Sequence, residues 1–146
     1  FFDELYHIPF IIYSPGIKKK LNQNLFSSVD INSTILDLIN STSPESFRGI
    51  SALKNSDGRE YILAENQGRG PCDLNNKPIM VCVRSKDYKI VYERSPHVNE
   101  SDKVRELYHI KEDTLEENNL SESSFHLREV DWMIDKARER VNEILT

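Results

Sequence analysis

The feature that most constrains the fold is a short apolar run close to residue 1. Residues 10–13 read FIIY, with Pro9 before them and Pro15-Gly16 after them. A continuous apolar run of strand length, bounded by turn residues, is typical of a strand covered on both faces, as in a parallel sheet. Such a strand needs neighbours on both sides, and little chain precedes it. We therefore expect its covering to come from polypeptide before Phe1, or from another chain.

The next periodic segment predicts a short amphipathic helix. Four apolar residues recur at positions i, i+4, i+7 and i+8, which places them on one helix face: Ile31, Ile35, Leu38 and Ile39. Asp30 is the expected N-cap, because its carboxylate can accept hydrogen bonds from the exposed amides of the first turn. Residues 40–44 (NSTSP) should end the helix, and residues 55–58 (NSDG) predict a turn.

Beyond this turn the pattern changes from helical to extended. Runs rich in β-branched and aromatic residues predict strands at residues 61–64, 79–83, 88–92 and 104–108. Residues 85–87 form a short connection between the second and third runs, so these two should form an antiparallel hairpin.

A closing helix is predicted from apolar residues that recur at three and four positions: Val130, Ile134, Ala137, Val141 and Ile144. Ser123 or Ser124 is its expected cap. This helix should dock on its own domain, with a partner helix as the alternative.

The expected fold class is α/β, as an α+β fragment. Residues 1–55 would be the last strand and helix of a large mixed or parallel α/β domain. Residues 56–146 would form a small four-stranded antiparallel sheet with a C-terminal helix.

Composition excludes some classes of function. The 146 residues carry a net charge of -5, which disfavours nucleic-acid binding through phosphate neutralisation. With 29% charged residues, the chain is too polar to predict a membrane span. Cys72 and Cys82 lack zinc-type spacing and are expected as buried or reduced thiols, with one bridge between them as the alternative.

The apolar start suggests a fragment of a longer protein.

One loop has a composition that suits anion binding. In residues 65–76 (ENQGRGPCDLNN), two glycines flank Arg69. Glycine allows close approach of the backbone to a ligand, and arginine can bind sulfate or phosphate through two parallel hydrogen bonds. The alternative is a surface loop whose glycines serve turns. Cys72 as a nucleophile would need an activating base that the sequence does not identify.

Three of these segments together resemble the C-terminal third of the sulfatases, in the alkaline-phosphatase-like superfamily. Residues 6–16 (YHIPFIIYSPG) are similar to the family's strand R-V-P-L-I-hydrophobic-x-x-P-G. Residues 29–38 (VDINSTILDL) resemble its V-x-x-x-D-hydrophobic-x-P-T-hydrophobic-L-D-L helix start. Residues 105–120 (RELYHIKEDTLEENNL) resemble x-E-L-Y-D-L-x-x-D-P-x-E-x-x-N-L, the most specific match, and residues 88–90 (YKI) resemble the Y-K-Y-I strand. The departures from the family pattern are His7, Ser33, His109 and Thr114.

The resemblance implies a sulfate-ester hydrolase whose chemistry lies in preceding polypeptide. Sulfatases use a formylglycine made from the Cys or Ser of C-x-P-x-R, beside a divalent metal, usually calcium. Residues 82–86 (CVRSK) lack the Pro and carry Lys in place of the Arg, so we reject them as this motif. We expect no catalytic residue, cofactor or metal ligand in this chain, and no hydrolase activity from it alone.

The partners implied are the missing N-terminal catalytic part and a small sulfate or phosphate ester. By position in the family, Glu65, Asn66 and Arg69 are the candidates for substrate contact, with Arg69 binding the anion. A phosphonate or phosphate ester hydrolase, or a phosphoethanolamine transferase of the same superfamily, is an alternative. A non-catalytic interaction domain is another.

Overall fold

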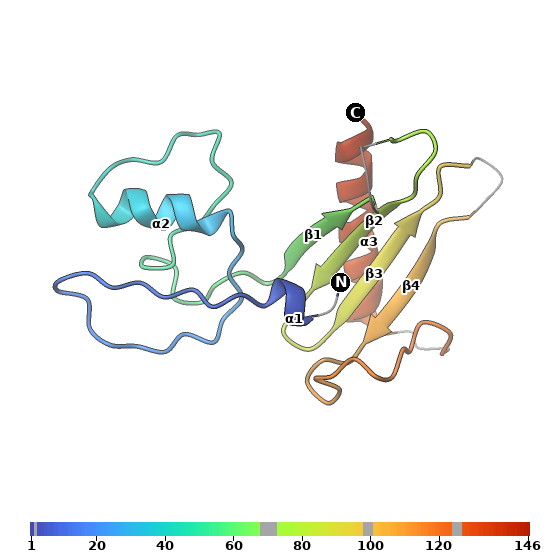
Figure 1. Cartoon of the computed structure of the whole chain (residues 1–146), viewed down its shortest axis with the longest axis horizontal. Helices are drawn as coiled ribbons and strands as arrows, with labels where there is room; N and C mark the ends of the chain where they lie inside the picture. The colour runs from blue at the N-terminus through green and yellow to red at the C-terminus, as the bar shows by residue number, and fades with distance from the viewer. Residues whose placement is uncertain (2, 68–72, 98–100, 124–126) are drawn as a thin grey trace. The chain divides into compact units, whose positions relative to one another are not determined.

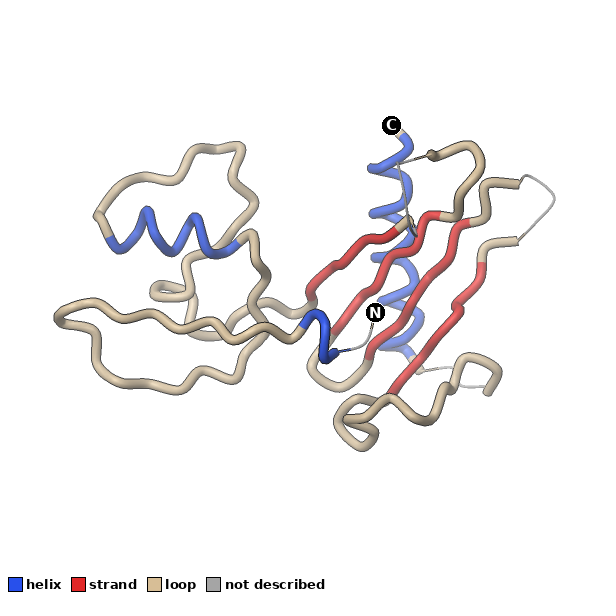
Figure 2. The backbone as a smooth tube through the Cα atoms, in the orientation of Figure 1, coloured by secondary structure: helices blue, strands red, loops and turns tan. Residues whose placement is uncertain are grey.

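The computed structural model describes residues 1, 3–67, 73–97, 101–123 and 127–146. The chain packs as two compact units (Figures 1 and 2). The N-terminal unit is Phe2–Glu60, and the sheet unit is Phe1 with Tyr61–Thr146. Assignment of residues 1–55 and 56–146 to two domains of a larger protein stays a prediction.

The sheet unit is built on a four-stranded antiparallel sheet. Its strands pair in chain order: β1 (Ile62–Asn66), β2 (Ile79–Arg84), β3 (Lys89–Arg94) and β4 (Lys103–Tyr108). All neighbouring pairs are antiparallel, with a register irregularity between Val91 and Tyr92. The Ser85 amide donates to the Tyr88 carbonyl at 2.9 Å and closes the β2–β3 turn. The predicted sheet and hairpin are confirmed.

Helix α3 (Arg128–Leu145) covers one face of this sheet (Figure 1). Four of its side chains are buried, and they pack with six side chains of β2, β3 and β4. The helix contributes Val130, Met133, Ala137 and Val141, and the sheet contributes Ile79, Val81, Val83, Ile90, Tyr92 and Leu107. The predicted docking of the helix on its own domain is confirmed, with Ile134 and Ile144 at the partly buried margin.

The predicted cap of α3 differs from the structure. The N-cap is Leu127, in extended conformation and without a side-chain cap hydrogen bond. Ser123 is therefore not the cap, and Ser124 lies outside the described residues. Acidic Glu129 and Asp131 in the first turn favour the start of the helix instead, because carboxylates interact well with the positive end of the helix dipole.

The segment after β4 closes the outer edge of that strand. The Asn119 side chain accepts a hydrogen bond from the Leu107 amide at 3.0 Å and donates one to the Arg105 carbonyl at 3.1 Å. The Leu120 amide then donates to the Leu107 carbonyl at 2.8 Å. An exposed strand edge offers unpaired backbone groups to other chains. Residues 119 and 120 thus satisfy backbone groups on the outer edge of β4.

The strand predicted over residues 10–13 is not formed within this chain. After the short helix α1 (Asp3–Tyr6), residues 7–14 belong to neither helix nor strand. Their side chains are largely uncovered, with Ile11 87% and Tyr13 94% exposed. A strand exists only through hydrogen bonds to a neighbour, and no described segment pairs with this one. The turn predicted at Pro15-Gly16 is present, with Gly16 at a φ of 88°.

Helix α2 (Asp30–Leu38) confirms the predicted helix but buries a different face. Its buried residues are Asp30, Ser33 and Thr34, whereas Ile35 and Ile39 are exposed. The polar face packs on residues 48–59 through hydrogen bonds, including Ser33 Oγ to the Gly49 carbonyl at 3.0 Å. Of the predicted packing face, Ile31 and Leu38 are half-buried, and Ile35 and Ile39 are exposed.

Candidate functional site

The antiparallel order brings several chain segments to one end of the sheet. β1 ends there, β2 begins, β3 ends and β4 begins, as the arrows in Figure 1 show. The C-terminal half of α3 reaches the same end, because its Arg140 contacts Glu65 at the end of β1. This end of the sheet is the candidate site, since it carries Glu65 and Asn66, two of the three predicted substrate-contact residues.

Glu65 and Asn66 lie in β1 rather than in the loop where the sequence pattern had placed them. Glu65 pairs with the core residue Val81, and Asn66 pairs with Met80. Because successive side chains on a strand point to opposite faces, Glu65 lies on the α3 face and Asn66 on the other. The structure therefore does not bring these two side chains together. Arg69 lies outside the described residues.

The Glu65 carboxylate is held by an arginine that sequence reasoning missed. Arg140 Nε donates to Glu65 Oε1 at 2.6 Å, and Arg140 Nη1 donates to Glu143 at 2.6 Å. These hydrogen bonds raise the pKa of the Arg140 guanidinium. Spacing along α3 could have indicated the Arg140–Glu143 pair, since residues three apart are neighbours on a helix. The pairing with Glu65 depends on helix docking and has no local signal.

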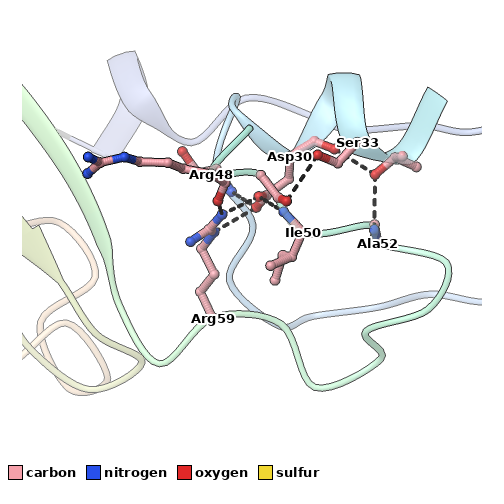
Figure 3. A network of polar contacts seen from close by, with 9 residues as sticks. Asp30, Ser33, Arg48, Ile50, Ala52 and Arg59 are labelled. Atoms are coloured by element: carbon pink, nitrogen blue, oxygen red, sulfur yellow. Dashed lines mark hydrogen bonds and ion pairs between the residues drawn. The ribbon is translucent and has the colours of Figure 1, made fainter. Parts of the chain in front are cut away.

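The N-terminal unit holds a buried ion pair at the start of α2 (Figure 3). Asp30 is fully buried, and its carboxylate accepts from Arg59 Nε at 2.9 Å. It also accepts from the Ile50 amide and the Ser27 amide, each at 2.8 Å. Asp30 is thus not the predicted N-cap, because Val29 occupies that position and the carboxylate turns to the flanking segments.

Burial alone would raise the pKa of Asp30. The hydrogen bonds from Arg59, Ile50 and Ser27, with the positive charge of Arg59, outweigh burial and lower that pKa below its ordinary value. Arg59 also donates to the Arg48 carbonyl at 2.9 Å. The contacts of Asp30 with Arg59, Ile50 and Ser27 all join parts of the N-terminal unit, so they stabilise the fold of that unit.

The described residues do not fit the calcium site that the sequence resemblance implies for the intact enzyme. No group of three or more His, Cys, Asp or Glu side chains in the described parts of the chain lies close enough to hold a metal ion. No described helix is long and apolar enough to cross a membrane.

Comparison with solved structures shows a sulfatase-like fold. One neighbour, described as a sulfatase of Bacteroides thetaiotaomicron VPI-5482, matches with a TM-score of 0.62 and 22% identity. The match covers 88% of this chain and 27% of that one. The second is BT4656, solved with its substrate D-glucosamine-2-N,6-O-disulfate. It matches with a TM-score of 0.54 and 21% identity, over 76% of this chain and 23% of that one.

This chain therefore spans about a quarter of the length of either neighbour. No protein-family profile matches it, and no curated protein sequence matches it either. At these identities the likeness shows the fold, and the sulfatase-like fold agrees with the fold class expected from the sequence.

Proposed function

We propose that this chain is the C-terminal part of a sulfatase-like hydrolase that cleaves sulfate esters of sugars. The observation that carries the proposal is the sulfatase-like fold over 88% of the chain. The sugar substrate is proposed from the neighbour BT4656, which was solved with its substrate D-glucosamine-2-N,6-O-disulfate. Formylglycine beside a divalent metal would supply the attack on sulfur and would come from preceding polypeptide.

Exposed apolar residues in the N-terminal unit support the assignment of this chain to one part of a larger enzyme. Ile8, Ile11 and Tyr13 are 60%, 87% and 94% exposed, although a strand of this composition is typical of a buried sheet. A contiguous segment of exposed apolar residues is typical of a surface that other polypeptide covers. In the proposed enzyme, residues 10–13 pair as a strand with the missing part of the large α/β domain.

The sheet end supplies the proposed contacts to substrate. Arg69 follows β1 and would bind the anionic group of the sugar through its planar guanidinium. Asn66 ends the same strand and would donate or accept a hydrogen bond with a hydroxyl group. Glu65 would act through its ion pair with Arg140, which holds the end of β1 against α3.

The test is an assay of the whole protein, including the polypeptide before Phe1, on glucosamine 6-sulfate and glucosamine 6-phosphate. Hydrolysis of the sulfate ester alone supports the proposal, and hydrolysis of the phosphate ester alone would contradict it. Arg69→Gln should lower kcat/KM by about tenfold or more, as expected for loss of a charged hydrogen bond. The matched control is Lys86→Gln, which removes one positive charge from the β2–β3 turn at the opposite end of the sheet.

A second pair of variants separates the role of Glu65 in the ion pair from direct contact with substrate. Glu65→Gln and Arg140→Gln both break the same pair. Equal losses of kcat/KM support the positioning role. A loss confined to Glu65→Gln, with Arg140→Gln at wild-type activity, would show that Glu65 contacts substrate directly.

The isolated chain of 146 residues should not hydrolyse a chromogenic aryl sulfate, because the proposed nucleophile and metal lie outside it. Addition of calcium should not change this result. Turnover that survives repeated purification would overturn the assignment of the chemistry to preceding polypeptide.

A further inference from the structure

A small polar pocket lies at the same end of the sheet unit, between the β3–β4 pair and the C-terminal half of α3. Its volume is about 160 Å³. The lining residues come from both layers: Tyr92, Arg94, Asp102, Arg138, Val141 and Asn142. Ligand pockets for whole drug-sized molecules span about 300–1,000 Å³. A pocket of this size suits one charged group or one sugar-sized unit.

The pocket is organised around a single carboxylate. Asp102 Oδ2 accepts from the Tyr92 hydroxyl at 2.8 Å and from Arg94 Nη1 at 3.1 Å. Tyr92 is 2% exposed, so its ring is a fixed wall rather than a mobile surface group. Burial raises the pKa of the Tyr92 hydroxyl, which therefore stays a hydrogen-bond donor to Asp102 at neutral pH.

A second guanidinium lies over the same tyrosine. The Arg138 guanidinium carbon is 5.9 Å from the centroid of the Tyr92 ring, within the range of a cation–π contact. Hydrogen bonding to Tyr92 raises the pKa of Arg138, so its charge is permanent. The lining thus carries two positive charges and one negative charge.

Both guanidiniums have donors to offer a ligand. Arginine carries five N–H donors in a planar fork; Arg94 directs one of them to Asp102, and Arg138 directs one to Asp135 at 3.3 Å, so each keeps further donors for a ligand. The Arg94 and Arg138 side chains are 47% and 58% exposed, so a ligand can reach them from solvent. Asn142 adds an amide group to the same lining.

We propose that this pocket binds a tetrahedral oxyanion, presented as a sulfate or phosphate group, between the guanidiniums of Arg94 and Arg138. Asn142 donates a further hydrogen bond, and Tyr92 and Val141 form the apolar wall. Asp102 positions Arg94 and at the same time opposes the anion by its negative charge. This inference does not depend on hydrolase activity, because the described residues of this chain supply the whole site.

The test is a titration of the ¹⁵N-labelled chain of 146 residues with sodium sulfate and, separately, sodium phosphate, at ionic strength held constant with sodium chloride. Saturable shifts of the backbone amides of residues 92–94, 102 and 138–142 are expected. Tighter binding of sulfate would assign the site to sulfate esters, and tighter binding of phosphate would assign it to phosphate esters. Absence of saturable shifts with both salts overturns the proposal.

Three variants make the test specific. Arg94→Gln and Arg138→Gln should each weaken binding by about tenfold, as expected for loss of one charged hydrogen bond. Arg128→Gln at the opposite end of α3 makes the same charge change outside the pocket and should leave affinity unchanged. An equal loss in Arg128→Gln would show a general charge effect and overturn the site.

Asp102→Asn should change the affinity for the anion in the opposite direction, toward tighter binding. The amide keeps an acceptor for the Tyr92 hydroxyl and removes the negative charge beside the anion, so binding should tighten several-fold. A variant that merely disturbed the fold would weaken binding instead. Weaker binding by Asp102→Asn, in a protein whose other amide resonances are unchanged, would contradict the proposed arrangement.

Discussion

Lys89 and Glu116 form an ion pair inside the sheet unit, with side chains 1% and 2% exposed. Lys89 Nζ also donates to the Phe1 carbonyl at 2.5 Å and lies 5.2 Å from the centroid of the Tyr108 ring. The pair joins two of the segments that resemble sulfatases, residues 88–90 and 105–120. Each segment supplies one charge of this buried pair, which therefore ties β3 to the segment that follows β4.

Removal of one member of this pair should strongly destabilise the sheet unit. Lys89→Met leaves the Glu116 charge buried, and loss of one partner of a buried ion pair costs about 3–5 kcal/mol of unfolding free energy. The double variant Lys89→Met with Glu116→Gln should recover most of that loss. Urea unfolding followed by circular dichroism measures both. Lys103→Met is the control: it removes an exposed lysine from Glu93, which keeps its partner Arg105, and should cost less than about 1 kcal/mol.

The Asp30–Arg59 pair should make the stability of the N-terminal unit depend on pH. The pKa of Asp30 is below its ordinary value of 3.8, so the folded unit favours the charged carboxylate. The resulting stabilisation is fully present above the ordinary pKa and is lost as the pH falls through the lowered folded-state pKa. The wild type should therefore exceed Asp30→Asn in the free energy of unfolding of the N-terminal unit, and this difference should shrink below about pH 4. NMR intensities of α2 amides in urea measure both free energies.

The partner of Asp30 provides a check on this explanation. In an Arg59→Gln background the carboxylate is buried without its cation, and burial by itself raises the pKa of Asp30. Asp30→Asn should then destabilise the N-terminal unit at pH 7 by less than it does in the wild type, because only the Ile50 and Ser27 amides still favour the charged carboxylate. A destabilising effect of the same size in both backgrounds would show that Arg59 does not act through Asp30.

Asn119 should contribute to stability through the edge of β4. Asn119→Ala removes the hydrogen bonds to Leu107 and Arg105 and should lower the free energy of unfolding by about 1–3 kcal/mol. Hydrogen exchange of the Leu107 amide should accelerate as well. Asn118→Ala is the matched control, because the hydrogen bond from Asn118 to Asp113 uses its main-chain amide, which alanine keeps. Equal effects of the two variants would contradict the role of the Asn119 side chain.

Gly49 should not accept a side chain. A Cβ atom there would overlap the Val29 carbonyl oxygen and lie 2.7 Å from Ser33 Oγ. Gly49→Ala should therefore push α2 away from residues 48–52 and cost about 1–3 kcal/mol, the usual penalty of overpacking. The Ile50 amide donates to Asp30, so its protection against hydrogen exchange should fall in this variant. Gly16→Ala, where the φ of 88° strains alanine but nothing lies within 4 Å of the new carbon, controls for backbone strain without a clash and should lower that protection less.

The sequence alone determined the elements of the sheet unit. Alternation and apolar content located β1 to β4 within two residues of their observed ends, and the three- and four-residue repeat located α3. These patterns are local, because each strand or helix displays its buried face at a fixed period. The β2–β3 hairpin was predicted in the same way, because a connection this short can join only neighbouring antiparallel strands.

Tertiary structure decided which groups meet. The periodicity of α2 indicated its apolar face, yet within this chain Asp30 and Thr34 are buried, because Arg59 and the amides of residues 50 and 52 satisfy them. Strand alternation separated Glu65 from Asn66, and docking of α3 joined Glu65 to Arg140. Residues 10–13 have strand composition but form no strand among the described residues. Pairings between distant residues have no period in the sequence, so only the folded chain reveals them.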